Sequence, residues 1–156
     1  MIFVTDETKR DPAKRWSLPD EVFFAAGGCH ILAYAFLKKY TDRNFKAIWI
    51  KPALGYRGNH IFVTDGKVVF DFEGTCSYEN YIEKTETQMK STFYQWDYEL
   101  IELPQHVLIS ESESRKNDGL WLREPEQFLH NALPRAKSYL ERFDTEIDKA
   151  ISVQNG

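Results

Sequence analysis

The fold of this chain is decided by one stretch, residues 60–72, which reads HIFVTDGKVVFDF. Two apolar runs rich in β-branched residues flank Asp65-Gly66, and an Asp-Gly pair in that setting is the strongest short-range signal for a β-hairpin. If these two residues form the whole turn, His60 lies directly opposite Asp71. Directly opposed residues share a face of the sheet, with Cβ atoms about 4.5–5.5 Å apart. The hairpin therefore predicts an imidazole beside a carboxylate.

A buried helix is expected before the hairpin, in residues 27–40, which read GGCHILAYAFLKKY. Every residue from Ile31 to Leu37 is apolar or aromatic, which is typical of a helix buried on most sides. The two preceding glycines end a helix or form a close-packed bend. We therefore expect Cys29 in the first turn of this helix, where free N–H groups and the helix dipole favour the thiolate over the thiol.

The other segments complete an α+β pattern, with helices before and after a set of antiparallel strands. At 156 residues the chain has the length of a single domain. The patterns predict a polar arm over residues 1–16, strands over 45–51, 95–103 and 107–109, a mobile surface loop over 110–119, a helix over 121–133 and an amphipathic C-terminal helix over 134–151.

Composition excludes several classes of protein. Hydrophobic residues make up 42% and charged residues 28%, which are the values of a globular chain. The net charge of −4 argues against a general nucleic-acid partner, and no run reaches the roughly 18 apolar residues of a membrane span. The N-terminus has no hydrophobic region of a signal peptide. Two cysteines are too few for a disulfide framework, so we expect a cytoplasmic protein with free thiols.

Three residues have the chemistry of a nucleophilic site. A carboxylate fixes the tautomer of a neighbouring imidazole and stabilises its protonated form, so Asp71 would orient His60. The imidazole would act as general base, and Cys29 would supply the nucleophile. The N–H groups at the start of the helix can hold a developing oxyanion, which is often worth roughly 3 kcal/mol per donor.

The neighbours of these residues are candidates for substrate binding. Gly28 would let a substrate backbone approach the sulfur closely, because glycine has no side chain. Arg57 lies in the loop before the hairpin and would contact an acidic group of a substrate near His60. Asn59, which directly precedes His60, is the third candidate.

The order of Cys, His and Asp on a helix and two successive strands resembles the papain-like cysteine superfamily. That superfamily includes papain-type peptidases, cell-wall amidases of the NlpC type, transglutaminase-like proteins and arylamine N-acetyltransferases. The resemblance is carried by AGGCH at 26–30, NHIFV at 59–63 and VFDFEG at 69–74. The short Cys-to-His interval is closer to the transglutaminase and NlpC branches than to papain itself. The resemblance implies a papain-like fold in which the N-terminal helix carrying Cys29 packs on an antiparallel sheet. It also implies a cofactor-free thiol hydrolase or acyltransferase that forms a covalent thioester with an amide or thioester substrate.

Other interpretations remain open at this stage. Cys29 could be a small core residue, since free cysteine is among the most buried residue types, and the His–Asp pair could be purely structural. The chain would then be an inactive papain-like fold that serves as a protein-binding or immunity-type module. His30 beside Cys29 suggests a metal, but adjacent helix residues point about 100° apart, so no metal site is expected. Cys76 is interpreted as a bystander thiol. The substrate class (small molecule, peptide or protein) and the choice between hydrolysis and acyl transfer stay undetermined.

Overall fold

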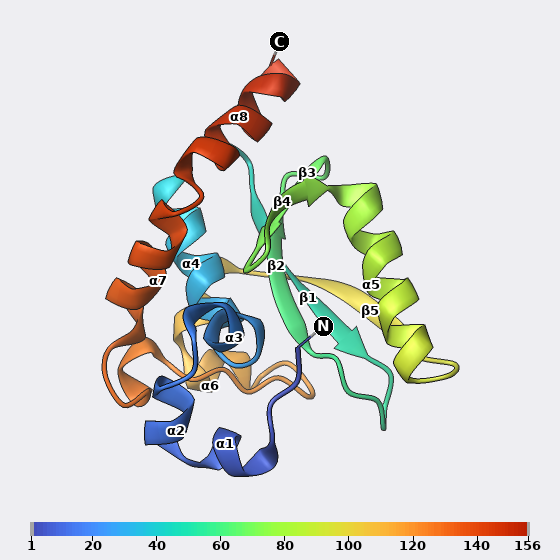
Figure 1. Ribbon diagram of the computed structural model, residues 1–156, viewed down its shortest axis with the longest axis vertical. Helices are drawn as coiled ribbons and strands as arrows, with labels where there is room; N and C mark the ends of the chain where they lie inside the picture. Colours follow the sequence, from blue (N-terminus) through green and yellow to red (C-terminus); the bar gives the residue numbers. More distant parts are fainter. Residues whose placement is uncertain (1, 156) are drawn as a thin grey trace.

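A five-stranded antiparallel sheet forms the centre of the computed structural model, which describes residues 2–155 (Figure 1). The strand order is β4-β3-β2-β1-β5, so the hairpin strands β2 and β3 lie in the middle of the sheet. The strands are β1 (Lys46–Pro52), β2 (His60–Thr64), β3 (Val68–Asp71), β4 (Gly74–Ser77) and β5 (Tyr98–Leu103). The α+β class predicted from the sequence is confirmed.

Helices cover both faces of the sheet, with α4 and α7 on one side and α5 on the other (Figure 1). The long helices are α4 (Cys29–Lys39), α5 (Tyr78–Thr92), α7 (Ala132–Glu141) and α8 (Asp144–Asn155). The shorter ones are α1 (Asp6–Arg10), α2 (Pro12–Trp16), α3 (Asp20–Ala25), α6 (Glu111–Ser114) and the 3₁₀ turns η1 (Gln105–Ile109) and η2 (Pro125–Gln127).

Two apolar cores lie on opposite faces of the sheet because successive strand residues point to opposite sides. Trp49 belongs to the larger core, which contains α3, α4 and α7. Its neighbour Ile50 belongs to the smaller core, which includes Met89 of α5. Helix α4 begins at Cys29, and all its residues from Ile31 to Leu37 except Tyr34 are buried. The buried helix expected from the sequence is therefore confirmed.

The hairpin connects β2 and β3 in a register different from the predicted one. Thr64 lies opposite Val69, whereas a two-residue turn would place it opposite Lys67. The turn is longer because the Asp65 carboxylate accepts hydrogen bonds from the N–H groups of Lys67 and Val68. The observed register differs from the predicted one by two residues. Side chains in a strand point to the same face at every second residue, so a shift of two leaves each side chain on its predicted face. His60 and Asp71 therefore keep a common face and meet as diagonal neighbours, not as a directly opposed pair.

Three expectations for the second half of the chain are wrong. Residues 107–109 belong to a 3₁₀ turn that begins after Pro104, where the N–H of Val107 bonds to the Pro104 carbonyl. Residues 121–133 are mostly non-helical, since the chain runs to the short turn η2 and α7 begins only at Ala132. The C-terminal helix is two helices, because the chain bends at Arg142 and Phe143 so that α7 packs on α4 and α8 on β4.

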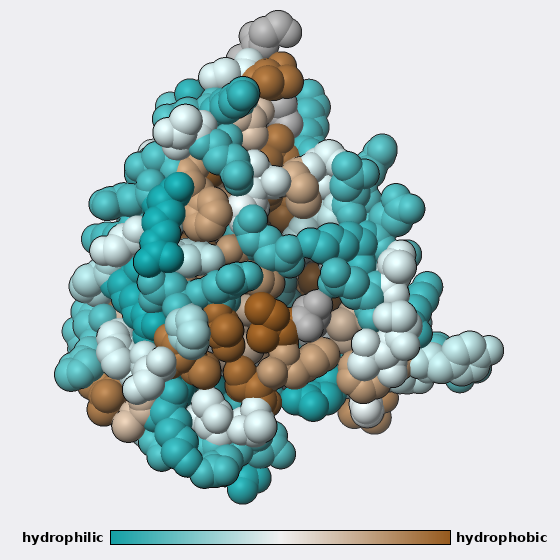
Figure 2. All heavy atoms as spheres, viewed as in Figure 1, coloured by the Kyte–Doolittle hydropathy of each residue, from teal (hydrophilic) through white to brown (hydrophobic). Residues whose placement is uncertain are grey.

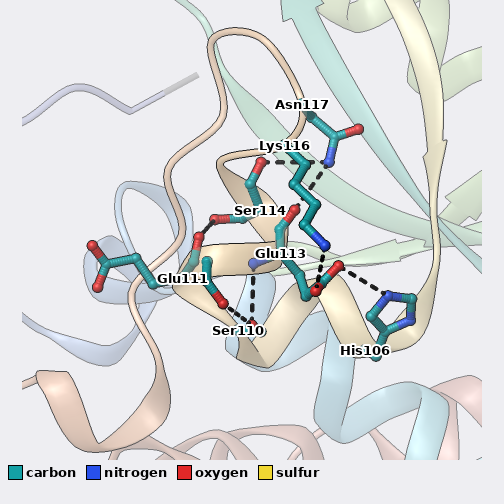
Figure 3. Close-up of polar contacts among 8 residues, drawn as sticks. His106, Ser110, Glu111, Glu113, Ser114, Lys116 and Asn117 are labelled. Atoms are coloured by element: carbon teal, nitrogen blue, oxygen red, sulfur yellow. Dashed lines mark hydrogen bonds and ion pairs between the residues drawn. The ribbon is translucent and has the colours of Figure 1, made fainter.

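The segment expected as a loop over 110–119 contains the helical turn α6, whose polar contacts are drawn in Figure 3. Ser110 caps the turn by accepting a hydrogen bond from the N–H of Glu113. The Glu113 carboxylate pairs with Lys116 at 2.8 Å and lies 3.7 Å from His106. Ser114 is fully buried, and its hydroxyl accepts a hydrogen bond from the N–H of Leu122. The turn thus fixes the position of the chain that follows it.

The polar N-terminal segment also has local structure. It forms α1 and α2, which are capped by the side chains of Thr5 and Asp11. The face of the molecule seen in Figure 2 is mainly hydrophilic, with apolar residues gathered around the place of α3. Within residues 2–155 no helix combines the length and the apolar character needed to cross a membrane.

Candidate active site

Cys29, His60 and Asp71 come together at one end of the sheet. Cys29 is the first residue of α4, His60 the first of β2 and Asp71 the last of β3. In two antiparallel neighbours, one strand begins where the other ends, so the start of β2 adjoins the end of β3. Helix α4 packs across β2 with its N-terminus at this edge, which brings the thiol to the imidazole.

A tight connection between α3 and α4 positions Cys29. Gly27 has a φ of +144°, a conformation that side chains other than glycine rarely adopt. Gly28 is buried, and its N–H bonds to the Phe23 carbonyl at 2.9 Å. A Cβ atom on Gly28 would meet the Phe23 ring at 2.6 Å, so only glycine fits there. The two glycines thus allow α4 to begin directly against α3, with the thiol in its first turn.

His60 is held by the carboxylate of Asp71. The Nε2 atom of His60 lies 3.1 Å from Oδ2 of Asp71, and both side chains are buried. The other ring nitrogen, Nδ1, is also buried and has no hydrogen-bond partner within the described residues. Because Nε2 is committed to the carboxylate, Nδ1 is the nitrogen left to exchange a proton with the neighbouring thiol.

Asp71 is itself fixed by two further donors. Its Oδ1 accepts a hydrogen bond from the N–H of Glu73 at 2.9 Å. Its Oδ2 accepts a second bond from the hydroxyl of Tyr81 at 2.9 Å, in addition to the contact with His60. Sequence reasoning missed Tyr81 and the whole of α5, although Tyr78, Tyr81, Thr85 and Met89 follow a helical spacing that could have revealed it. The carboxylate can therefore orient the imidazole in only one way.

The electrostatics favour an ion pair between Cys29 and His60. Burial raises the pKa of the Cys29 thiol, but contacts with His30 and His60 outweigh it and bring the pKa to about 5. Burial lowers the pKa of His60, but the Asp71 carboxylate and the Cys29 sulfur outweigh it and bring the pKa to about 10. Between these values the pair holds a thiolate beside an imidazolium, which is the reactive form of a cysteine nucleophile.

His30 joins the start of α4 to a distant part of the chain. Its Nε2 donates a hydrogen bond of 2.7 Å to the carbonyl of Arg123, and its ring packs against Phe128. The side chain is buried and also contacts the Cys29 thiol. His30 therefore contacts the Cys29 thiol on one side and holds the segment around Arg123 on the other.

A cavity of about 610 Å³ lies over the thiol. Cys29, His30 and His60 line it together with Trp49 and Trp121. A cavity of this size accommodates a small molecule or a short stretch of peptide. Cys29 is thus partly accessible from the cavity, and the buried His60 lies at its wall.

The three candidate substrate-binding residues are placed differently from one another. Asn59 lines the cavity, and its side-chain oxygen accepts a hydrogen bond from the indole N–H of Trp49 at 2.9 Å. Gly28 packs against Phe23, whereas its neighbour Gly27 lines the cavity. The guanidinium of Arg57 lies over the ring of Phe3, and Arg57 does not line the cavity. Only Asn59 of the three reaches the space over the thiol.

Cys76 is a free, exposed thiol on β4. Partial burial and the nearby Asp71 carboxylate raise the pKa of this thiol above 9.0. It therefore lacks the activation found at Cys29, in agreement with its interpretation as a bystander. Within residues 2–155 no group of three or more His, Cys, Asp and Glu side chains is arranged to hold a metal ion.

Comparisons with known proteins add no relative to this picture. No family model matches the chain, and no curated protein or solved structure matches it.

Proposed function

We propose that the protein is a thiol hydrolase or acyltransferase of papain-like fold, in which Cys29 forms a covalent thioester with its substrate. His60 transfers the protons, and Asp71 orients His60. One observation carries this proposal: Cys29 and His60 interact and line the same open cavity, while Nε2 of His60 is held by Asp71 and its Nδ1 has no hydrogen-bond partner among the described residues.

The first step is attack of the Cys29 thiolate on the carbonyl carbon of an amide, ester or thioester. A C–S bond forms, and the carbonyl oxygen becomes an oxyanion. The N–H groups of Cys29 and His30 precede the first hydrogen bonds of α4, which run from Ile31 and Leu32 to the Gly28 carbonyl. These free donors and the helix dipole stabilise the negative charge at that end of the helix.

Collapse of this intermediate breaks the bond to the leaving group. The His60 imidazolium donates its Nδ1 proton to the departing nitrogen, oxygen or sulfur, and a thioester remains on Cys29. Neutral His60 then removes a proton from an attacking water or amine, whose addition breaks the C–S bond and restores the thiolate–imidazolium pair. Water makes the protein a hydrolase, and an amine makes it an acyltransferase.

A catalytically inactive binding module is less well supported. Such a module predicts a Cys29 sulfur enclosed by apolar side chains, with its pKa raised by burial. Cys29 packs against the larger core on one side, but it also lines the open cavity, and its pKa is lowered to about 5. Nothing in a structural role requires Asp71 to receive three donors and Nδ1 of the same imidazole to remain unbonded.

The direct test is to trap the acyl-enzyme. The protein is incubated with a panel of acyl thioesters and activated esters, and intact mass spectrometry records the added acyl group. We expect a single adduct that peptide mapping places on Cys29. The Cys76→Ala variant should form it at the wild-type rate, and Cys29→Ala should not form it at all. An adduct that persists in Cys29→Ala, or that lies on Cys76, would contradict the proposal.

A further inference from the structure

We propose that the acyl substrate carries an anionic group, a carboxylate or a phosphate, which binds to Arg15 and Arg123 in the cavity over Cys29. This inference rests on the proposed function and names the substrate class of the same site. From the sequence, contact with an acidic substrate group was expected of Arg57, which does not line the cavity, whereas Arg15 and Arg123 were not singled out.

The lining of the cavity has one sign of charge. Lys9, Arg10, Arg15 and Arg123 all contribute to it, and no Asp or Glu does. The chain as a whole has 24 acidic and 20 basic residues, so a random set of its charged residues would contain similar numbers of both signs. A cavity lined by charges of one sign concentrates ligands of the opposite sign.

These four cations are also unpaired. Within the described residues none of the four makes an ion pair. Elsewhere basic side chains form ion pairs with carboxylates. Lys84 pairs with Glu73, and Arg115 pairs with Glu111 at an N–O distance of 2.8 Å. Four cations without counter-ions thus line the cavity over Cys29. A negatively charged group of the substrate would supply the missing counter-ion there.

Arg15 is the most constrained of the four. Its Nε atom is buried and has no hydrogen-bond partner among the described residues. Its guanidinium lies so close over Gly27 that a Cβ atom there would meet it at 3.4 Å. Burial, together with the charge of Arg123, lowers the pKa of Arg15. Two guanidinium groups held near each other without an anion repel, and a bound carboxylate or phosphate would remove that repulsion.

Arg123 is held in place by the elements around it. Its carbonyl accepts the hydrogen bond from His30, one residue after the nucleophile. The N–H of Leu122 bonds to the buried hydroxyl of Ser114, within the α6 turn drawn in Figure 3. The segment that carries Arg123 is therefore fixed relative to Cys29 by contacts on both of its sides. An arginine carried by a fixed backbone loses less entropy on binding an anion than one on a mobile loop.

The rest of the lining suits the carbon chain of such a substrate. Trp49, Ile61, Leu120 and Leu122 offer apolar surface in the same cavity. Guanidinium groups bind carboxylate and phosphate through paired N–H···O bonds, and apolar side chains bind the linker. We therefore expect an acyl compound with a charged end and an uncharged chain.

The test compares two alkylating reagents of nearly equal size, iodoacetate and iodoacetamide, which differ in charge. Each displaces iodide at the sulfur, and peptide mass spectrometry separates Cys29 from Cys76. The ratio of the iodoacetate rate to the iodoacetamide rate at Cys29 reports the attraction of the cavity for an anion. We expect Arg15→Gln and Arg123→Gln each to lower this ratio about threefold to tenfold. Added salt should reduce the difference in ratio between the wild type and each variant.

The matched control is Arg43→Gln, which removes the same charge from an exposed residue beyond the far end of α4. Its ratio and its iodoacetamide rate should both equal those of the wild type. An unchanged ratio in Arg15→Gln and Arg123→Gln, with fast iodoacetamide labelling, overturns the anion site and leaves the proposed function standing. Slow iodoacetamide labelling of Cys29 in the wild type contradicts the proposed function instead.

A second measurement decides the anion site without using the thiol's reactivity. The melting temperature of the wild type is recorded with glutarate, with inorganic phosphate and with neutral glutaramide. We expect at least one anion to raise it, and the double variant Arg15→Gln/Arg123→Gln to lose that rise. Glutarate alone indicates a carboxylate, and phosphate alone indicates a phosphoryl group. No rise with either anion, or a rise that survives in the double variant, overturns the proposal.

Discussion

The hydroxyl of Tyr81 donates a hydrogen bond of 2.9 Å to the same oxygen of Asp71 that contacts His60. Both residues are buried, and the bond joins α5 to the end of β3. The helix on the far face of the sheet thus takes part in orienting the imidazole. Tyr81 does not line the cavity over the thiol, so it acts as a positioning residue.

Tyr81→Phe tests this role. We expect stability to fall by about 1 kcal/mol, because a buried hydrogen bond is lost and Asp71 keeps its other donors. Turnover of an identified acyl substrate should fall several-fold through kcat, with KM unchanged, since the hydroxyl bonds to Asp71 and the tyrosine does not line the cavity. Asp71→Asn should lower kcat much further, because an amide cannot stabilise the imidazolium. A Tyr81→Phe variant with wild-type kcat would show that the hydroxyl has a structural role only.

Gly28→Ala should displace the Cys29 thiol. The new Cβ atom would meet Cε1 of Phe23 at 2.6 Å, and Phe23 is buried and cannot move freely. Overpacking of this kind costs about 1–3 kcal/mol. Chemical denaturation measures that loss, and alkylation of Cys29 should slow in the folded variant. Wild-type stability together with wild-type alkylation would mean that the start of α4 tolerates the added methyl group.

The unpaired arginines should contribute little to stability, in contrast to Arg135. Arg135 donates hydrogen bonds to Asp20 and to the carbonyls of Trp16 and Leu18, so Arg135→Gln should cost about 2 kcal/mol or more. Arg15→Gln relieves repulsion with Arg123 and should leave the melting temperature unchanged or raise it. A large destabilisation by Arg15→Gln would indicate that this residue has a structural role.

The ion pair between Cys29 and His60 gives stability a characteristic pH dependence. The pKa of Cys29 is lowered from 9.0 to about 5, so its contribution is fully present above pH 9 and is lost as the pH falls to about 5. The pKa of His60 is raised from 6.5 to about 10, so its contribution is fully present below pH 6.5 and is lost as the pH rises to about 10.

These two dependences determine the stability difference between the wild type and His60→Gln. The variant loses the His60 contribution and the part of the Cys29 contribution that comes from His60, while His30 remains. The difference should rise from pH 5 to 6.5, stay level to pH 9 while the two slopes oppose each other, and fall from pH 9 to 10. Calorimetric melting temperatures across this range measure it. A difference that is constant with pH would contradict the ion pair.

The sequence predicted the parts of the site that depend on local patterns. The Asp65-Gly66 turn indicated the hairpin, and the uniform apolar run after Cys29 indicated the buried helix. The turn was two residues longer than predicted, because Asp65 caps two N–H groups. This two-residue offset kept His60 and Asp71 on the same face of the sheet. Local chemistry was therefore enough to bring His60 and Asp71 together.

The parts that were missed depend on packing between distant segments. Arg15 and Arg123 are far apart in the chain, and only the packing of α2 against the segment after α6 gives them a common cavity. Tyr81 reaches Asp71 only because α5 folds over the smaller core. No spacing within one element encodes such contacts. The short helical elements after residue 104 and the break between α7 and α8 were missed, because the spacing of apolar residues does not show where the chain bends.

The most direct test of the central claim is the pH dependence of Cys29 alkylation by iodoacetamide, with Cys76 as the internal control. We predict a half-maximal rate near pH 5 and full reactivity at pH 7, while Cys76 reacts only as the pH exceeds 9. His60→Ala should move the midpoint of Cys29 toward the ordinary cysteine value of about 8.5. If Cys29 titrates in parallel with Cys76, or its midpoint does not depend on His60, Cys29 is not an activated nucleophile and the account is contradicted.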